Sequence, residues 1–184
     1  GMETLHKVGA IGLPGLGWET KIVDSELHEV PPGEVGELAV KGPGRMKEYF
    51  RNPTATEEVL KDGWLLTGDM ARQDADGFIW LVDRKKDVII MGGENIFPVE
   101  IENFIQAHPK VQDVAVIGLP NDRLGEIPAA IVQVKRDQQL GVEELNEYCR
   151  SLPRYKRPRR VILAEVPRNA TGKIEKQKLR KQYS

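Results

Sequence analysis

Two segments of the sequence carry polar side chains suited to holding a sugar or a phosphate. In Thr67-Gly68-Asp69 a carboxylate follows a glycine at a strand end, and its two oxygens can accept hydrogen bonds from a diol such as ribose. Arg84 follows another apolar run and offers a fixed fork of donors suited to phosphate or ribose. Taken alone, a plain turn aspartate and a solvated surface arginine are the simpler interpretations.

Two glycine-containing turns are further candidates. Gly92-Gly93 is either an ordinary hairpin turn or a place where bare backbone lets a ligand pass close by. The turn over residues 167–173 delivers Lys173, a compact positive charge that can neutralise a phosphate or carboxylate. It is not a Walker loop, because Ile174 follows the Gly-Lys pair where that motif needs Ser or Thr. An ordinary surface lysine is the alternative.

The composition excludes several classes of protein. Apolar residues make up 40% of the 184 residues and the net charge is −1, which argues against general disorder. No apolar run approaches ~20 residues, so we expect no transmembrane segment. One cysteine, Cys149, and three scattered histidines provide neither an intramolecular disulfide nor the spacing of a structural zinc site. With no secretory leader in view, we expect a cytoplasmic protein that binds no metal through this chain.

The near-zero net charge hides a basic C-terminal segment. Residues 150–184 hold 12 Lys or Arg against 2 Asp or Glu. Such a segment can bind nucleic acid, an anionic membrane or a phosphate-bearing small ligand, or it can be a solvated helix face. Only Tyr155 lies near the basic cluster, without the interleaved aromatic residues on which bases stack, so nucleic acid is disfavoured as a partner.

The elements that must position these residues differ between the two halves. Up to about residue 82, glycines and prolines separate short β-like runs, which predicts a small twisted sheet or open barrel. Beyond Asp83 helices and strands mix, and the lack of Pro or Gly in residues 83–87 predicts a compact hinge. The expected strands of the first half are residues 21–23, 35–40, 64–66, 70–72 and 78–82, with a hairpin loop at 74–77 and a helix at 52–60. In the second half we expect a hairpin of residues 88–91 and 95–97, helices over 98–107, 142–152 and 174–183, and strands at 114–119, 129–134 and 160–166.

The order and spacing of three motifs resemble the adenylate-forming superfamily, most closely the AMP-forming acyl-CoA synthetases of the fatty-acyl-CoA ligase type. These motifs are residues 64–69, residues 83–102 and residues 167–173, and the long middle one is the most specific. Residues 32–38 and 121–126 match as well, so the resemblance covers nearly the whole chain. Asp83 and Asn95 depart from the commoner glycine and basic residue of the family, but fatty-acyl branches tolerate both.

The resemblance implies an α+β fold with two parts. Residues 2–82 would form the last β subdomain of a large N-terminal region, of the distorted-barrel type. Residues 83–87 would be the hinge. Residues 88–184 would form a mobile, mixed α/β C-terminal domain with a three-stranded sheet flanked by helices.

The same resemblance assigns roles to the candidate residues. Asp69 would hold the ribose hydroxyls of ATP or AMP, and Arg84 would contact the same nucleotide. Lys86 falls at the hinge position. The Gly92-Gly93 hairpin, through Gly93, would face the active site in the thioester step and line the pantetheine tunnel. Lys173 would bridge the substrate carboxylate and the α-phosphate during adenylation.

In this family a carboxylic acid, here a fatty acid, reacts with ATP to give an acyl-adenylate and pyrophosphate, and CoA then displaces AMP. Arg123 and, as a second candidate, Arg150 match positions that some members use for CoA phosphates. The phosphate loop, the Mg²⁺-binding segment and the acyl pocket lie upstream in the family and are not in this sequence. We therefore expect the C-terminal part of a synthetase, inactive without the N-terminal part.

Two other functions remain open at this stage. One is a nucleic-acid-binding module built on the basic C-terminal segment. The other is a non-catalytic remnant that keeps the fold without the chemistry, against which the presence of Asp69, Arg84 and Lys173 argues mildly.

Overall fold

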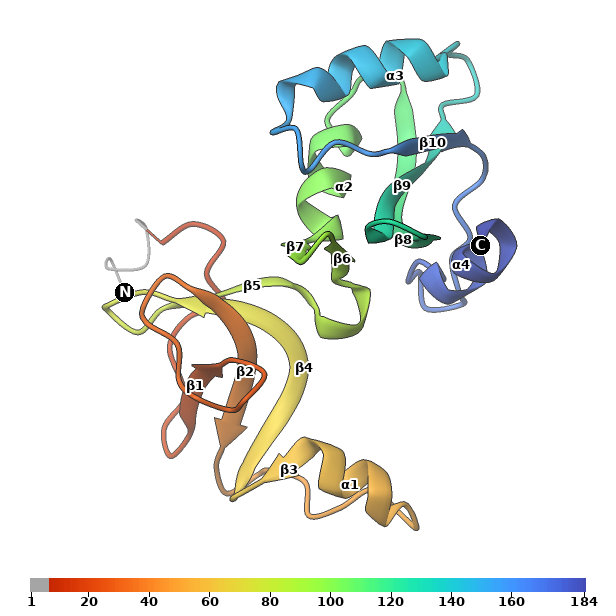
Figure 1. Cartoon of the computed structure of the whole chain (residues 1–184). Helices are drawn as coiled ribbons and strands as arrows, with labels where there is room; N and C mark the ends of the chain where they lie inside the picture. The colour runs from red at the N-terminus through yellow and green to blue at the C-terminus, as the bar shows by residue number, and fades with distance from the viewer. Residues whose placement is uncertain (1–6) are drawn as a thin grey trace. The chain divides into compact units, whose positions relative to one another are not determined.

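A computed structural model describes residues 7–184, so the first five residues of the predicted β subdomain lie outside the described part. The chain divides into two compact units, and the division falls between Lys86 and Asp87 (Figure 1). We call these the first unit and the second unit and describe each by itself.

The first unit is built on a curled antiparallel sheet of five strands (Figure 1). β4 (Trp64–Gln73) pairs with β2 (Val35–Lys41) along one edge, and with β3 (Leu60–Lys61) and β5 (Ile79–Arg84) along the other. β1 (Glu19–Val23) pairs with β2 and completes the sheet. This curled sheet confirms the predicted twisted β subdomain. It is a thin layer with a small core. The buried side chains that form this core are Ile22, Leu38, Ala71 and Ile79.

Two local features of this sheet follow from its glycines and caps. The strands predicted at residues 64–66 and 70–72 are one continuous strand, because Gly68 turns the backbone at φ +74° without ending the pairing. α1 (Pro53–Val59) is one residue shorter at each end than the predicted helix over 52–60. Asn52 caps it by accepting a hydrogen bond from the Ala55 amide at 3.1 Å, and proline occupies the first turn, where its missing N–H costs nothing.

The second unit has a mixed sheet with helices on both faces. β9 (Gly125–Val134) is its centre, antiparallel to β8 (Val111–Asn121) and parallel to β10 (Arg160–Leu163). These are the three strands expected for this domain. The hairpin of β6 (Ile89–Met91) and β7 (Glu94–Ile96) joins β9 through the Met91–Gly125 pair and extends the sheet to five strands.

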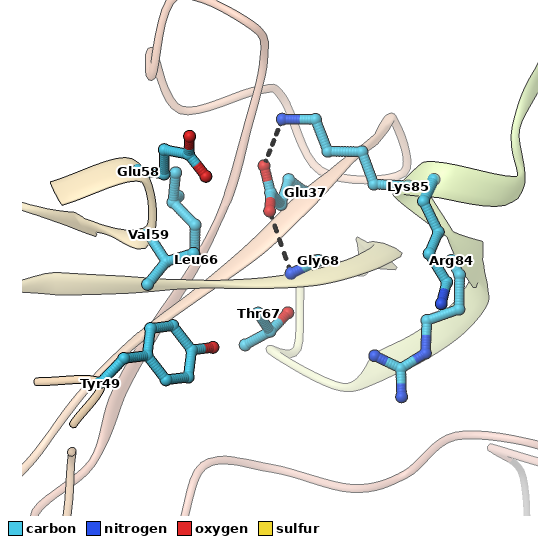
Figure 2. Close-up of a pocket in the computed structure, with 10 residues that line it drawn as sticks. Glu37, Tyr49, Glu58, Val59, Leu66, Thr67, Gly68, Arg84 and Lys85 are labelled. Atoms are coloured by element: carbon cyan, nitrogen blue, oxygen red, sulfur yellow. Dashed lines mark hydrogen bonds and ion pairs between the residues drawn. The ribbon is translucent and has the colours of Figure 1, made fainter. Parts of the chain in front are cut away.

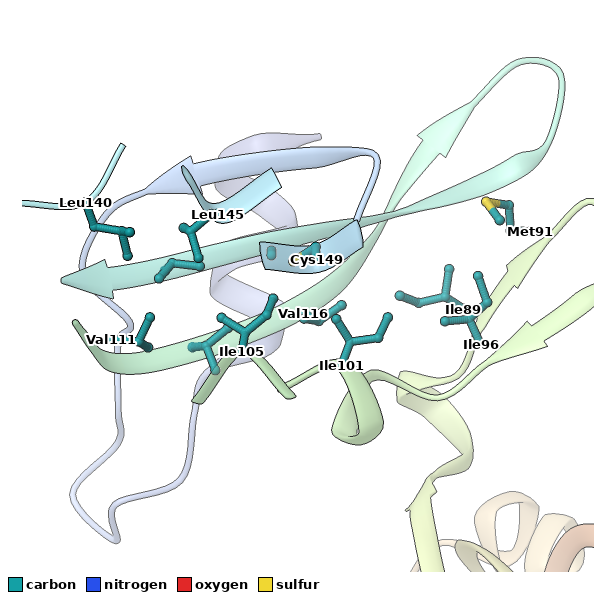
Figure 3. Packing of buried hydrophobic residues seen from close by; sticks show 13 residues of the cluster. Ile89, Met91, Ile96, Ile101, Ile105, Val111, Val116, Leu140, Leu145 and Cys149 are labelled. Carbon is teal, nitrogen blue, oxygen red and sulfur yellow. The ribbon is translucent and has the colours of Figure 1, made fainter. Parts of the chain in front are cut away.

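The continuous apolar runs of β8 and β9 are explained by helices on both faces. Alternate residues of each strand point to opposite sides. α2 (Pro98–Gln106) and α3 (Val142–Tyr148) cover one face, where Ile101 and Leu145 are fully buried (Figure 3). α4 (Lys176–Tyr183) covers the other face through Leu179.

Some boundaries in the second unit differ from expectation. The predicted helix over residues 142–152 is α3 followed by a 3-10 turn, η3 (Cys149–Ser151), and the predicted strand over 160–166 ends at Leu163. The last helix starts at Lys176, two residues later than expected, because the lysine-bearing turn extends into Ile174. Within residues 7–184, no helix combines the length and the apolar character needed to cross a bilayer.

Candidate functional site

Asp69 and Arg84 lie opposite each other on β4 and β5 and form an ion pair. Arg84 Nη1 is 2.8 Å from Asp69 Oδ1, while no partner among residues 7–184 contacts Asp69 Oδ2. Thr67 fixes the backbone that leads to Asp69, because its hydroxyl donates to the Leu38 carbonyl at 2.8 Å and accepts from the Asp69 amide at 3.1 Å. This nucleotide corner, meaning Asp69 and Arg84 with Thr67 and Gly68, offers a free acceptor oxygen beside a cation. That is the donor and acceptor set that a ribose with its phosphate requires.

A buried carboxylate, Glu37, supports this corner from β2. Glu37 Oε1 accepts a hydrogen bond from the Gly68 amide at 3.0 Å, and Glu37 Oε2 lies 2.8 Å from Lys85 Nζ (Figure 2). The surrounding cavity of about 610 Å³ also receives Tyr49 and Arg84 from neighbouring segments. Sequence reasoning missed Glu37 as a site residue. The signal was an acidic residue in the middle of an otherwise apolar strand.

The five residues 83–87, which we call the joint, differ in how they are held. Arg84 and Lys85 contact Asp69 and Glu37 of the first unit, whereas Asp87 Oδ1 lies 2.9 Å from Arg180 Nη2 in the second. Lys86, the predicted hinge residue, is exposed and its side chain has no partner in the part of the chain that the structure describes.

The glycine hairpin and Arg123 lie next to each other in the second unit. Gly92 and Gly93 have φ of +60° and +89°, the two positive values that a tight two-residue hairpin of this kind needs. The Gly92 amide donates to the Leu124 carbonyl at 2.8 Å, which joins the hairpin to the turn that carries Arg123. A Cβ at Gly93 would meet nothing within 4 Å, and Arg123 is exposed with no side-chain partner among the described residues. Open backbone beside a free cation suits a chain that ends in phosphates.

Arg150 lies elsewhere. It belongs to η3 and pairs with Glu147 at 3.0 Å, so its guanidinium already has an anion. Of the two arginines matched to CoA phosphates, only Arg123 lies beside the glycine hairpin.

Lys173 sits on a turn whose backbone is firmly held. Asn169 Oδ1 accepts from the amides of Thr171 and Lys173 at 3.0 and 2.9 Å, and Asn169 N donates to the Lys173 carbonyl. Arg168 binds Asp113 of β8 through Nε and Nη2, at 2.7 and 2.9 Å. The Lys173 side chain itself is exposed, and none of the described residues pairs with it. The lysine loop (residues 167–173) therefore presents a free ammonium on a fixed backbone.

Sequence reasoning named Lys173 but missed the residues that hold its loop, Arg168, Asn169 and Asp113. Asp113 is 55 positions from Arg168, so no local pattern could have paired them. Throughout residues 7–184, no three His, Cys, Asp or Glu side chains converge as metal ligands.

Two family models match the chain. The C-terminal domain of AMP-binding enzymes matches residues 100–173, and the AMP-binding enzyme model matches residues 1–50. The chain belongs to the AMP-binding, adenylate-forming enzyme family. The match to the C-terminal domain, residues 100–173, falls within the second unit.

Several similar proteins are named as CoA ligases or CoA synthetases. A long-chain-fatty-acid–CoA ligase of Escherichia coli O6:H1 is 47% identical over 94% of this chain and 31% of its own length. A feruloyl-CoA synthase of an Amycolatopsis species is 41% identical over 97% of this chain and 37% of its own length. The o-succinylbenzoate-CoA synthetase MenE of Bacillus subtilis, solved with an acyl-adenylate, has TM-score 0.88 and 36% identity over 97% of this chain and 37% of that chain. The chain thus spans about a third of the length of these relatives.

Proposed function

We propose that this chain is the C-terminal part of an ATP-dependent, AMP-forming fatty-acid–CoA ligase. The observation that carries the proposal is the lysine loop, where hydrogen bonds and the Arg168–Asp113 pair fix the backbone around Lys173, whose side chain pairs with none of residues 7–184. A cation that serves only solubility needs no such bracing. The Asp69–Arg84 pair and the open Gly93 hairpin give independent support.

The chemistry explains why a free lysine is needed. Adenylation joins two anions, a carboxylate and the α-phosphate of ATP, and their repulsion must be cancelled where charge accumulates. One ammonium about 4 Å away contributes on the order of 4 kcal/mol at an effective dielectric of 20. In this proposal Lys173 supplies that charge, while Asp69 accepts from the ribose hydroxyls and Arg84 contacts the same nucleotide.

The second step has different requirements. A lysine left over the reacting centre would obstruct the CoA thiol, so a rotation at Lys86 removes it and brings the Gly92-Gly93 hairpin forward. Gly93 then lets the pantetheine pass close to the backbone, and Arg123 binds CoA phosphate. Arg150 is a weaker candidate for that role, because Glu147 already neutralises it.

Fatty acids are the proposed acid substrate because the E. coli relative carries that name, whereas the Amycolatopsis relative is named for feruloyl-CoA. The acyl pocket and the Mg²⁺ site would belong to the N-terminal part, and the ligase would act in the cytoplasm. We propose that the chain needs that part for activity.

The test is Lys173→Ala in the intact synthetase. We expect adenylation to fall by about 10²–10³-fold, while thioester formation from supplied acyl-adenylate keeps its rate. Acid-dependent ATP–pyrophosphate exchange measures the first step and CoA consumption the second. Lys178→Ala, an exposed lysine on α4, is the matched control. An equal fall in both steps would contradict the two-orientation mechanism.

A further inference from the structure

The side chains on either side of Lys86 are anchored, each within its own unit. On the first-unit side, Lys85 Nζ lies 2.8 Å from Glu37 Oε2, and the Glu37 side chain is only 7% exposed (Figure 2). The other oxygen of Glu37 accepts from the Gly68 amide, directly before Asp69. Because a buried carboxylate is stable only when its charge is compensated, Glu37 holds Lys85 and the nucleotide corner together.

On the second-unit side, the anchor is the Asp87–Arg180 pair. Arg180 Nη2 lies 2.9 Å from Asp87 Oδ1, and their side chains are 26% and 12% exposed. Arg180 lies on α4, the helix that follows the lysine loop. That helix is fixed to the rest of the unit by buried Leu179 and by the Lys176–Glu102 pair, whose side chains are 13% and 14% exposed. Asp87 is thus tied to the same helix that leads back to Lys173.

We propose that these two clamps, Glu37–Lys85 and Asp87–Arg180, confine rotation of the joint to Lys86 and make Glu37 and Arg180 positioning residues. Each clamp ends one residue from Lys86, the only joint residue whose side chain lacks a partner within residues 7–184. With both clamps closed, the nucleotide corner and the lysine loop each move as one piece with their end of the joint. The catalytic use of that motion rests on the proposed function, whereas the clamps themselves do not.

The experiment is backbone ¹⁵N relaxation on this chain, with order parameters read at residues 84–88. In the unchanged chain we expect values of about 0.85, typical of rigid backbone, at Lys85 and Asp87. Glu37→Gln should lower the value at Lys85 toward about 0.6 and leave Asp87 unchanged. Arg180→Met should lower the value at Asp87 and leave the value at Lys85 unchanged. Glutamine still accepts from Gly68, so the Glu37 variant removes the charge and keeps the local hydrogen bond.

Further variants separate a clamp from a general loss of stability. Lys85→Met opens the first clamp from its exposed partner, which serves if the buried Glu37 variant fails to fold. Lys85→Arg and Arg180→Lys keep the charges and should restore the order parameters. Lys110→Met is the control. It breaks the 2.7 Å ion pair between Lys110 and Glu144, which lies near the Val134 end of β9, whereas the hairpin joins the Gly125 end.

The proposal is supported if each clamp variant lowers the order parameter only on its own side of Lys86 and the charge-keeping variants restore it. Unchanged order parameters in the clamp variants, or equal changes on both sides of Lys86, would overturn it. In the intact synthetase, Arg180→Met should slow both half-reactions by about tenfold and leave the KM for ATP unchanged. If neither half-reaction occurs in the unchanged enzyme while the relaxation pattern holds, the proposed function fails and the clamps stand.

Discussion

The Asp69 carboxylate uses only one of its two oxygens for contacts with residues 7–184. Arg84 contacts one carboxylate oxygen, and the other has no partner among residues 7–184. The ion pair orients the carboxylate, and the bond between Thr67 and the Asp69 amide fixes the backbone beneath it. A hydroxyl donor can therefore bind to Asp69 without first breaking an internal contact.

At this position Asp69→Asn tests the binding role. We expect the KM for ATP of the intact synthetase to rise by about 10- to 100-fold, because a hydrogen bond to a charged group contributes about 1.5–3 kcal/mol. The KM is measured by ATP–pyrophosphate exchange at saturating acid. Asp62→Asn, at an exposed turn with φ +50°, is the control, since asparagine tolerates that backbone. An unchanged KM for Asp69→Asn would remove Asp69 from the nucleotide site.

The residue types indicated the candidate site residues but not the residues that hold them in place. Asp69, Arg84 and Lys173 were identifiable because their chemistry and motif context are local. Glu37 was not, since its partner Lys85 lies 48 positions away and an acid in a strand usually faces water. Long-range pairing is information that one sequence does not contain.

Among the elements, the lysine loop depends on a contact with the sheet. Asp113, at the start of β8, is 17% exposed and binds Arg168 with both oxygens. This pair fixes the loop to β8, which pairs with the central strand β9.

Asp113→Asn should therefore impair the loop rather than the fold. We expect adenylation to slow by about 10- to 100-fold, because displacing a reacting group by about 1 Å has effects of this size. Thioester formation from supplied acyl-adenylate should keep its rate in the same half-reaction assays. Asp137→Asn, at an exposed turn after β9, should change neither step. If Asp113→Asn slowed both steps equally, the loop would not be its point of action.

The glycine hairpin gives a second prediction at this scale. Gly93→Ala should lower the free energy of unfolding of the second unit by about 1–2 kcal/mol, because φ is +89° and no neighbour is close enough to add a clash. Thermal unfolding measures this cost. Gly141→Ala, at φ −91°, adds no left-handed strain, so its cost is limited to the poorer helix cap that alanine makes at the start of α3. In the intact enzyme, the thioester step alone should slow; a slower adenylation step would argue against the tunnel assignment.

Elements with strong local signals were predicted well. Asn52 and Pro53 fixed the start of α1, and the apolar runs of β8 and β9 indicated buried strands. The continuity of β4 through Gly68 was not predictable, because a glycine within strand-like sequence more often marks a turn. Pairing with β2 and β5 on both sides keeps that strand intact.

For the whole molecule, the charge is more evenly distributed between the two structural units than the basic composition of residues 150–184 indicates. The first unit has 11 Lys or Arg against 15 Asp or Glu, and the second has 16 against 13. Six of the 12 basic residues after position 149 form ion pairs within the second unit. Half of the basic residues in this segment thus have an acidic partner within the unit. This weakens the argument for nucleic-acid binding and the argument for a general surface that attracts phosphates.

At the same scale we predict that this chain alone shows no acid-dependent ATP–pyrophosphate exchange. In the proposed function the nucleotide corner contacts only the ribose and its phosphate, whereas the acyl pocket and the Mg²⁺ site belong to the N-terminal part. Among the described residues no three His, Cys, Asp or Glu side chains converge as metal ligands. The assay compares the chain with the intact synthetase at equal concentration. Exchange above the enzyme-free background would show that the upstream part is dispensable.

Cys149, the sole cysteine, lies in the core of the second unit with 2% of its surface exposed. Burial raises the pKa of its thiol, so at neutral pH it stays protonated and unreactive toward maleimides. New cysteines introduced at exposed positions, one in each unit, can therefore be labelled with a fluorophore pair without interference from the native thiol. Energy transfer between the two dyes would then test whether the chain rotates about Lys86 in solution.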